Sequence, residues 1–126
     1  MKKNLVFETN VDRDGNTVRI RFLGRVGAPD MGGILEEFST AVAAMRPGFL
    51  LLTDLSALES MDVACAPQIG KMMELGRTRG IGTVVRIVPD YTKDIGFNIM
   101  SCFHYDHGVS IITCETAAEA ERAMGV

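Results

Sequence analysis

The amino-acid sequence predicts an α/β protein with a mixed sheet whose central strands are parallel. Two observations predict it: a β-hairpin pattern opens the chain, and apolar strands then alternate strictly with amphipathic helices. The predicted order is ββαβαβαβα, in which helices cross over between parallel strands. The chain has 126 residues, of which 47% are hydrophobic and 23% charged, so we expect one domain spanning residues 1–126.

The opening hairpin is predicted from alternating side chains on either side of an Asp-Gly turn. Its strands are residues 5–11 and 17–26, and Asp14-Gly15 is typical of a tight hairpin turn. Apolar and charged side chains alternate in the second strand, at Val18, Arg19, Ile20, Arg21 and Phe22. This period of two indicates one buried face and one hydrated face.

The remaining elements are predicted from apolar runs, helical stripes and chain breakers. The expected strands are residues 49–54, 83–88 and 109–114, and the expected helices are residues 31–45, 62–79, 92–103 and 116–124. In the second helix, Val63 shares an apolar stripe with Ile69 and Met72, which predicts that it faces the core. Asp62 and Thr116 are expected to cap the helices that follow them.

Composition and charge exclude some classes of partner and some cellular compartments. The net charge of -3 lacks the basic footprint of a nucleic-acid-binding protein. No apolar stretch approaches the roughly 18 residues of a membrane span, and the N-terminus has no secretory apolar region. Three cysteines at irregular spacing do not form a disulfide framework. We therefore expect a soluble, cytoplasmic protein with no bound cofactor and no metal.

The stretch after the second hairpin strand resembles a known family. Leu50 to Ser56, then Met61-Asp62, a helix and Arg79-Gly80 resemble a STAS domain, found in bacterial anti-sigma-factor antagonists and at the cytoplasmic end of sulfate transporters. The resemblance implies a STAS-like fold and a small bacterial signalling module. It also implies regulation through a protein partner, such as an anti-sigma-type kinase.

The sequence departs from this family at its functional motif. The family has Asp-Ser-Ser-Gly at the start of the second helix, and the second serine is phosphorylated. The matching residues are Asp62-Val63-Ala64-Cys65, and Ala64 has no hydroxyl group. The resemblance therefore implies a partner surface that lacks the phosphorylation switch, formed by Asp54, Ser56, Ser60, Asp62, Ala64 and Cys65. Ser56 and Ser60 are nearby candidates for a substitute phosphorylation site.

A second hypothesis is the binding of a small anion, a nucleotide or a lipid. Arg86 interrupts an apolar strand and requires water, a carboxylate or an anionic ligand. Asp54, Asp62 and Asp90 are candidates for the same rim of the sheet, where parallel strands end and ligands commonly bind. Turn formation and helix capping are the structural alternative for these aspartates.

A third hypothesis is catalysis by a cysteine nucleophile. Cys65 is expected in the first turn of a helix, which stabilises thiolates, and His104 or His107 is a candidate base. Simple packing of a small side chain at the helix start is the structural alternative. No complete catalytic motif is present, so we expect a protein that is not an enzyme. Homodimers are common enough that we also expect one here.

Overall fold

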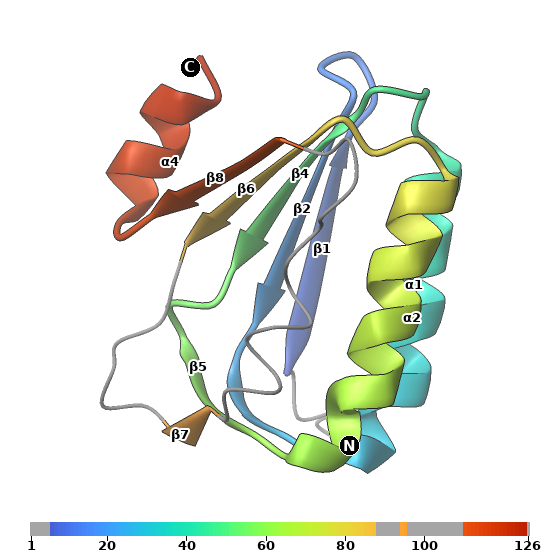
Figure 1. Ribbon diagram of the computed structural model, residues 1–126, viewed down its shortest axis with the longest axis vertical. Helices are drawn as coiled ribbons and strands as arrows, with labels where there is room; N and C mark the ends of the chain where they lie inside the picture. The colour runs from blue at the N-terminus through green and yellow to red at the C-terminus, as the bar shows by residue number, and fades with distance from the viewer. Residues whose placement is uncertain (1–5, 88–93, 96–109, 126) are drawn as a thin grey trace, which may run out of the picture.

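A main sheet forms the centre of the structure. The computed structural model describes residues 6–87, 94–95 and 110–125. Five strands lie in the order β1-β2-β4-β6-β8 (Figure 1). Their bounds are β1 Phe7–Asp12, β2 Thr17–Phe22, β4 Leu50–Asp54, β6 Thr83–Ile87 and β8 Ser110–Cys114. β1 and β2 are antiparallel and the later pairs are parallel, which confirms the predicted hairpin and the mixed sheet with a parallel centre.

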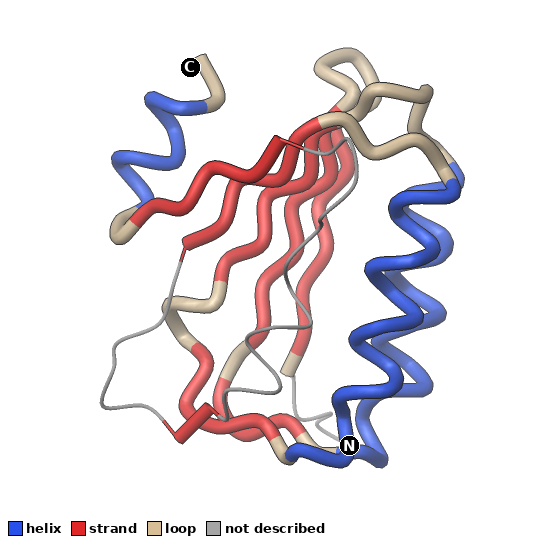
Figure 2. Tube along the Cα trace, viewed as in Figure 1, coloured by secondary structure: helices blue, strands red, loops and turns tan. Residues whose placement is uncertain are grey.

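A second, smaller sheet lies beyond the carboxyl ends of the parallel strands of the main sheet (Figure 1). It consists of β3 (Gly24–Val26), β5 (Leu58–Met61) and β7 (Asp94–Ile95), paired in parallel in that order (Figure 2). The prediction of one continuous strand over residues 17–26 is wrong, because Gly24 adopts φ +63° and ends the pairing with the main sheet.

One predicted helix conflicts with this second sheet. Residues 92–103 were expected to be helical, but Asp94–Ile95 are extended and pair with Ser60 and Met61 of β5. Pairing with a neighbouring strand thus outweighs the local helical pattern at these two positions. The rest of that range lies outside the described residues.

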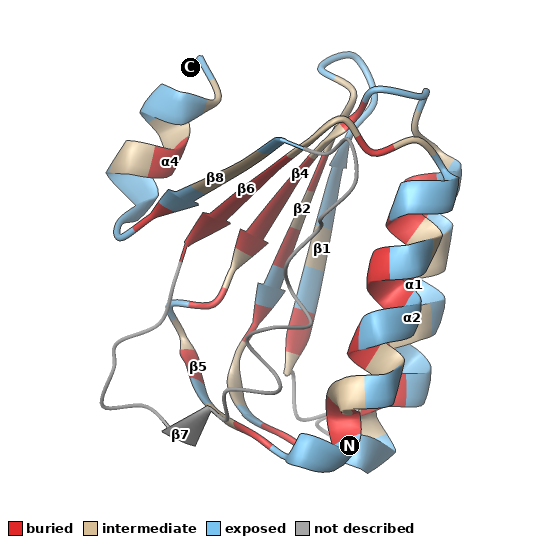
Figure 3. Ribbon diagram, in the orientation of Figure 1, coloured by how far each residue is buried: buried red, intermediate tan, exposed pale blue. Residues whose placement is uncertain are grey.

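Two helices cover one face of the main sheet. They are α1 (Met31–Ala43) and α2 (Ala66–Thr78), which lie side by side in Figure 1. Short 3₁₀ turns lead into them, η1 (Ala28–Asp30) and η2 (Val63–Cys65). Their buried faces and the inward side chains of the strands form the main core, including Val18, Ile20, Phe38, Leu51, Ile69, Met72 and Val84. Figure 3 shows this burial on the inward sides of both helices.

Among the described residues, α4 (Ala117–Ala123) is the helix that covers part of the opposite face of the sheet. It packs on β6 and β8, and the cluster beneath it contains Leu52, Val85, Ile87, Cys114 and Ala120. Thr116 caps this helix as predicted, because its Oγ1 accepts a hydrogen bond from Glu119 N at 3.1 Å. Arg19 on β2 binds Glu121 on α4 at 2.9 Å.

Two loops approach each other closely at the amino-terminal ends of β4 and β6. Gly48 N donates to Gly80 O at 2.6 Å, and Gly82 N donates to Phe49 O at 2.8 Å. A Cβ atom built on Gly82 would lie 2.8 Å from Gly48 O. Because that oxygen belongs to the backbone, the contact requires glycine at position 82.

In the part of the chain that the structure describes, no helix has the length and apolar character needed to cross a membrane.

Candidate functional site

The predicted site residues are distributed along the bend between the two sheets. Asp54 and Ser56 follow β4, and Asp62 and Ala64 follow β5, where the chain enters α2. β5 therefore separates the two groups by roughly 13 Å of extended chain. Asp90 lies outside the described residues. The structure thus divides the predicted surface into a polar network at the bend and a second site at the start of α2.

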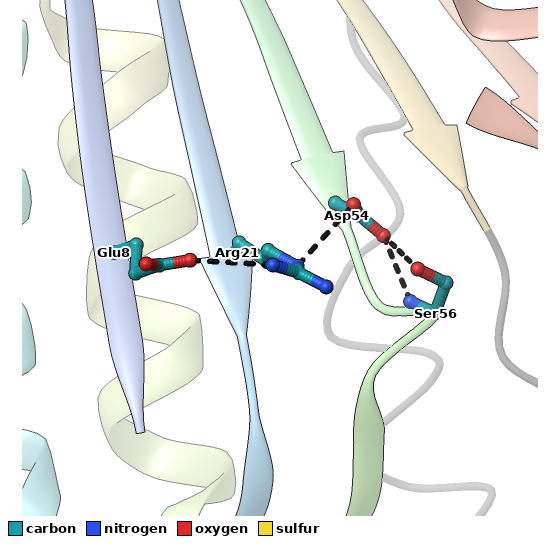
Figure 4. A network of polar contacts seen from close by, with 4 residues as sticks. All are labelled: Glu8, Arg21, Asp54 and Ser56. Carbon is teal, nitrogen blue, oxygen red and sulfur yellow. Dashed lines mark hydrogen bonds and ion pairs between the residues drawn. The ribbon is translucent and has the colours of Figure 1, made fainter. Parts of the chain in front are cut away.

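The polar network at the bend crosses three strands. Arg21 on β2 lies between two carboxylates, with Nη1 3.5 Å from Glu8 Oε1 and Nε 3.7 Å from Asp54 Oδ2 (Figure 4). Asp54 Oδ1 accepts hydrogen bonds from Ser56 N at 2.9 Å and from Ser56 Oγ at 2.6 Å. Asp54 therefore holds the turn that connects the two sheets, while Ser56 remains exposed.

The start of α2 is organised by Asp62. Asp62 Oδ1 accepts a hydrogen bond from Ala64 N at 3.0 Å, which confirms that Asp62 caps this segment. The cap belongs to the 3₁₀ turn η2, which precedes the α-helix proper. Ala64 is exposed and Ser60 is half-buried. The backbone of this segment is thus fixed while its outer side chains remain accessible.

Val63 is a surface residue that sequence reasoning placed in the core. It is 59% exposed, whereas the prediction assigned it to the buried stripe of the second helix. The prediction is wrong because residues 63–65 form a 3₁₀ turn, whose tighter winding changes which side chains face inward. Cys65 takes the inward position instead. One signal for this exposure was available in the sequence. The Asp-Ser-Ser-Gly motif of the family has a serine where this chain has Val63.

Cys65 is packed in the core and does not contribute side-chain surface. It is 0% exposed, and its Sγ donates a hydrogen bond to Val26 O at 3.8 Å. Burial raises the pKa of the Cys65 thiol, and the charges of Asp62 and Asp30 raise it further. These effects keep the thiol protonated, opposite to the lowered pKa that a nucleophile at a helix start requires. His104 and His107 lie outside the described residues.

Alkylation of Cys65 is expected to be slow in the folded protein. In a Cys102→Ala/Cys114→Ala background, iodoacetamide at pH 8 should modify the native protein about 100-fold more slowly than the urea-unfolded protein, because labelling requires opening of the core. Mass spectrometry over time measures both rates. Native labelling at pH 8 as fast as that of the urea-unfolded protein would contradict the buried, protonated thiol.

Arg86 lies on the other side of the sheet from Asp54. Arg86 is 5% exposed, and its Nη2 donates to Thr113 Oγ1 at 3.1 Å. Burial lowers the pKa of the guanidinium. In the strand register Arg86 pairs with Thr53, whereas Asp54 pairs with Ile87. Because neighbouring residues of a strand point to opposite faces, the predicted grouping of Arg86 with Asp54 in one ligand site is wrong.

The described residues contain no group of three or more side chains arranged to hold a metal ion. The residues that the structure does bring together are Glu8, Arg21, Asp54 and Ser56 at the bend, and Asp62, Val63 and Ala64 at the start of α2. Glu8 and Arg21 were not among the predicted site residues. Their alternation in the hairpin strands was visible, but the approach of Arg21 to Asp54 depends on the order of strands in the sheet.

Comparison with known proteins identifies the fold. No family model matches the chain, and no curated protein sequence matches it either. An uncharacterized protein of the DUF3478 family with a SpoIIAA-like fold, from Shewanella loihica PV-4, superposes with a TM-score of 0.63 at 15% identity over 98% of each chain.

Two anti-sigma factor antagonists of known structure are also similar. SpoIIAA in its unphosphorylated form has a TM-score of 0.60 at 21% identity, over 95% of this chain and 99% of its own. An antagonist from Mycobacterium paratuberculosis has a TM-score of 0.57 at 18% identity, over 95% of each chain. The chain therefore has the SpoIIAA-like fold, which confirms the STAS-like architecture predicted from the sequence.

Proposed function

We propose that this protein is a regulatory module that binds a protein partner through the start of α2, without phosphorylation at that position. The observation that carries the proposal is the 59% exposure of Val63, a large hydrophobic side chain on a segment held in place by Asp62. An exposed apolar side chain on a rigid segment is suited to bury itself in a partner.

The neighbours of Val63 support the proposal. Ala64 and Pro67 are also exposed, so the outer side of this segment carries three accessible apolar residues. Ala64 has no hydroxyl group that a kinase could modify. Two proteins with the same fold are described as anti-sigma factor antagonists, a class that acts through another protein. If this chain binds its partner through the same end of the fold, that surface is constitutive, because phosphorylation at position 64 does not control it.

A binding function agrees better with the site than catalysis or ligand binding does. The thiol of Cys65 is buried, and its raised pKa is unsuited to a nucleophile. Arg86 and Asp54 lie on opposite faces of the sheet, which removes the grouping that an anion site required. We therefore propose an interaction module of the bacterial signalling type and not an enzyme.

Replacing Val63 by aspartate is expected to weaken partner binding about tenfold or more, because it puts a charge into an apolar contact. The measurement is quantitative mass spectrometry of proteins captured from an extract of the source cell. Ala118→Asp is the control, since Ala118 is an exposed apolar residue at the start of α4, on the opposite face of the main sheet from α2. Thermal unfolding of both variants should match the wild type, because neither side chain belongs to the core.

The proposal predicts at least one protein that is captured by the wild type and by Ala118→Asp but lost with Val63→Asp. If every captured protein is retained by Val63→Asp, the start of α2 is not the partner surface.

A further inference from the structure

Among the described residues, no strand covers the outer edge of the main sheet. β1 lies at the end of the strand order and, within the described residues, pairs with β2 alone. Val6 O accepts a hydrogen bond from Leu23 N at 2.9 Å, which fixes the alternation of the antiparallel ladder. By that alternation Glu8 turns its backbone groups toward β2, whereas Thr9 and Val11 turn their N–H and C=O groups outward.

A groove of about 690 Å³ runs beside this edge. Thr9 and Val11 line one side of it, so the residues with outward backbone groups also contribute side chains. The other side is formed by α1 and the residue that follows it, where Gly33, Ala41 and Ala44 are small. Glu36, Glu37 and Thr40 supply the polar groups on this side. Gly33 would have no neighbour within 4 Å of an added Cβ.

The groove is acidic along its helical side. Glu36 and Glu37 are both exposed, and neither has an ion-pair partner among the described residues. Arg13 supplies one positive charge at the end of the groove. A strand lying against β1 would therefore gain from positive side chains directed toward α1.

We propose that β1 and this groove bind an extended, lysine- or arginine-bearing segment of a partner protein as an added strand. The outward groups of Thr9 and Val11 supply the backbone hydrogen bonds, and Glu36 and Glu37 select the basic side chains. This surface is separate from the start of α2, so the inference does not depend on the proposed function.

A second copy of this chain is a poorer occupant of the same edge. Pairing β1 with its own copy would place Glu36 and Glu37 of both helices at one interface. Like charges brought together across an interface oppose association. The acidic edge thus favours a different, basic sequence over self-association.

Hydrogen exchange with a defined peptide tests the proposal. The probe is an acetylated and amidated hexapeptide of alternating threonine and lysine, and the counter-probe has glutamate in place of lysine. At saturating lysine peptide, the Thr9 and Val11 amides should exchange about tenfold or more slowly. The Glu8 and Asn10 amides, which face β2 in the free protein, provide the internal reference and should change little.

Charge reversal on the protein complements the exchange of lysine for glutamate in the peptide. Glu36→Lys and Glu37→Lys should each lower the affinity for the lysine peptide about fivefold, as expected for loss of an exposed charge pair. Both should raise the affinity for the glutamate peptide. Glu115→Lys makes the same change of charge at an exposed site before α4 and should alter neither. Val63→Asp should also leave peptide binding unchanged.

Three results would overturn the proposal. The first is exchange at Thr9 and Val11 that does not respond to millimolar lysine peptide. The second is equal binding of the lysine and glutamate peptides. The third is protection of Thr9 and Val11 that rises with protein concentration when no peptide is present, because it would assign this edge to a second copy of the chain.

Discussion

Leu58→Ala is expected to lower the free energy of unfolding by about 2–5 kcal/mol, the range for leucine-to-alanine changes in a packed core. Leu58 is 0% exposed and belongs to the main core, although its strand β5 is only four residues long. Because β5 is the central strand of the small sheet and leads directly into η2, its loss should also disturb the segment that carries Val63.

The control for this variant is the next residue of the same strand. Glu59 is exposed, so Glu59→Ala should change the free energy of unfolding by no more than about 0.5 kcal/mol. Urea unfolding followed by circular dichroism measures both variants. A loss below 1 kcal/mol for Leu58→Ala would mean that the small sheet contributes little to the core.

Gly82→Ala is the second substitution with a large expected effect, a loss of about 1–3 kcal/mol from forced overpacking. The new methyl group would lie 2.8 Å from Gly48 O, and its other two nearest atoms are also backbone atoms of Gly48. Neither loop has a flexible side chain there that can move aside. Relief therefore requires a shift of the backbone that holds the starts of β4 and β6 together.

Gly70→Ala is the matched comparison for this glycine. Gly70 lies inside α2, is exposed, and has nothing within 4 Å of an added Cβ. Alanine there should raise the free energy of unfolding by about 0.5–1 kcal/mol through its better helix propensity. Urea denaturation of both variants decides the matter. Equal effects of the same sign would show that the close contact at Gly82 is relieved without cost.

The parts of the fold that the sequence predicts are those with a repeated pattern. Val18, Ile20 and Phe22 alternate with arginines over a whole strand, so burial of one face follows from a period of two. The apolar run at β4 and the stripes of α1 and α2 extend over enough residues to identify their type. Hydrophobic burial dominates in these segments, and the local pattern reports it directly.

The parts that sequence reasoning missed depend on local winding or on register. β5 is too short for its alternation to stand out, and the tighter turn of η2 exchanged the expected positions of Val63 and Cys65. Asp54 was grouped with Arg86 because Asp54 follows one central strand and Arg86 interrupts the next. Their separation onto two faces depends on which residue of β4 pairs with which residue of β6, and strand order and pairing are long-range properties.

The strand order of the main sheet has a consequence for how the chain folds. Consecutive main-sheet strands are spatial neighbours throughout, from the hairpin to β8. Each strand can therefore join an edge that is already formed, in the order in which a ribosome releases them. Loop closure is limited to one crossover at a time, which keeps its entropic cost modest. Until β8 is added, however, β6 remains an unprotected edge of the growing sheet and exposes the nascent chain to aggregation.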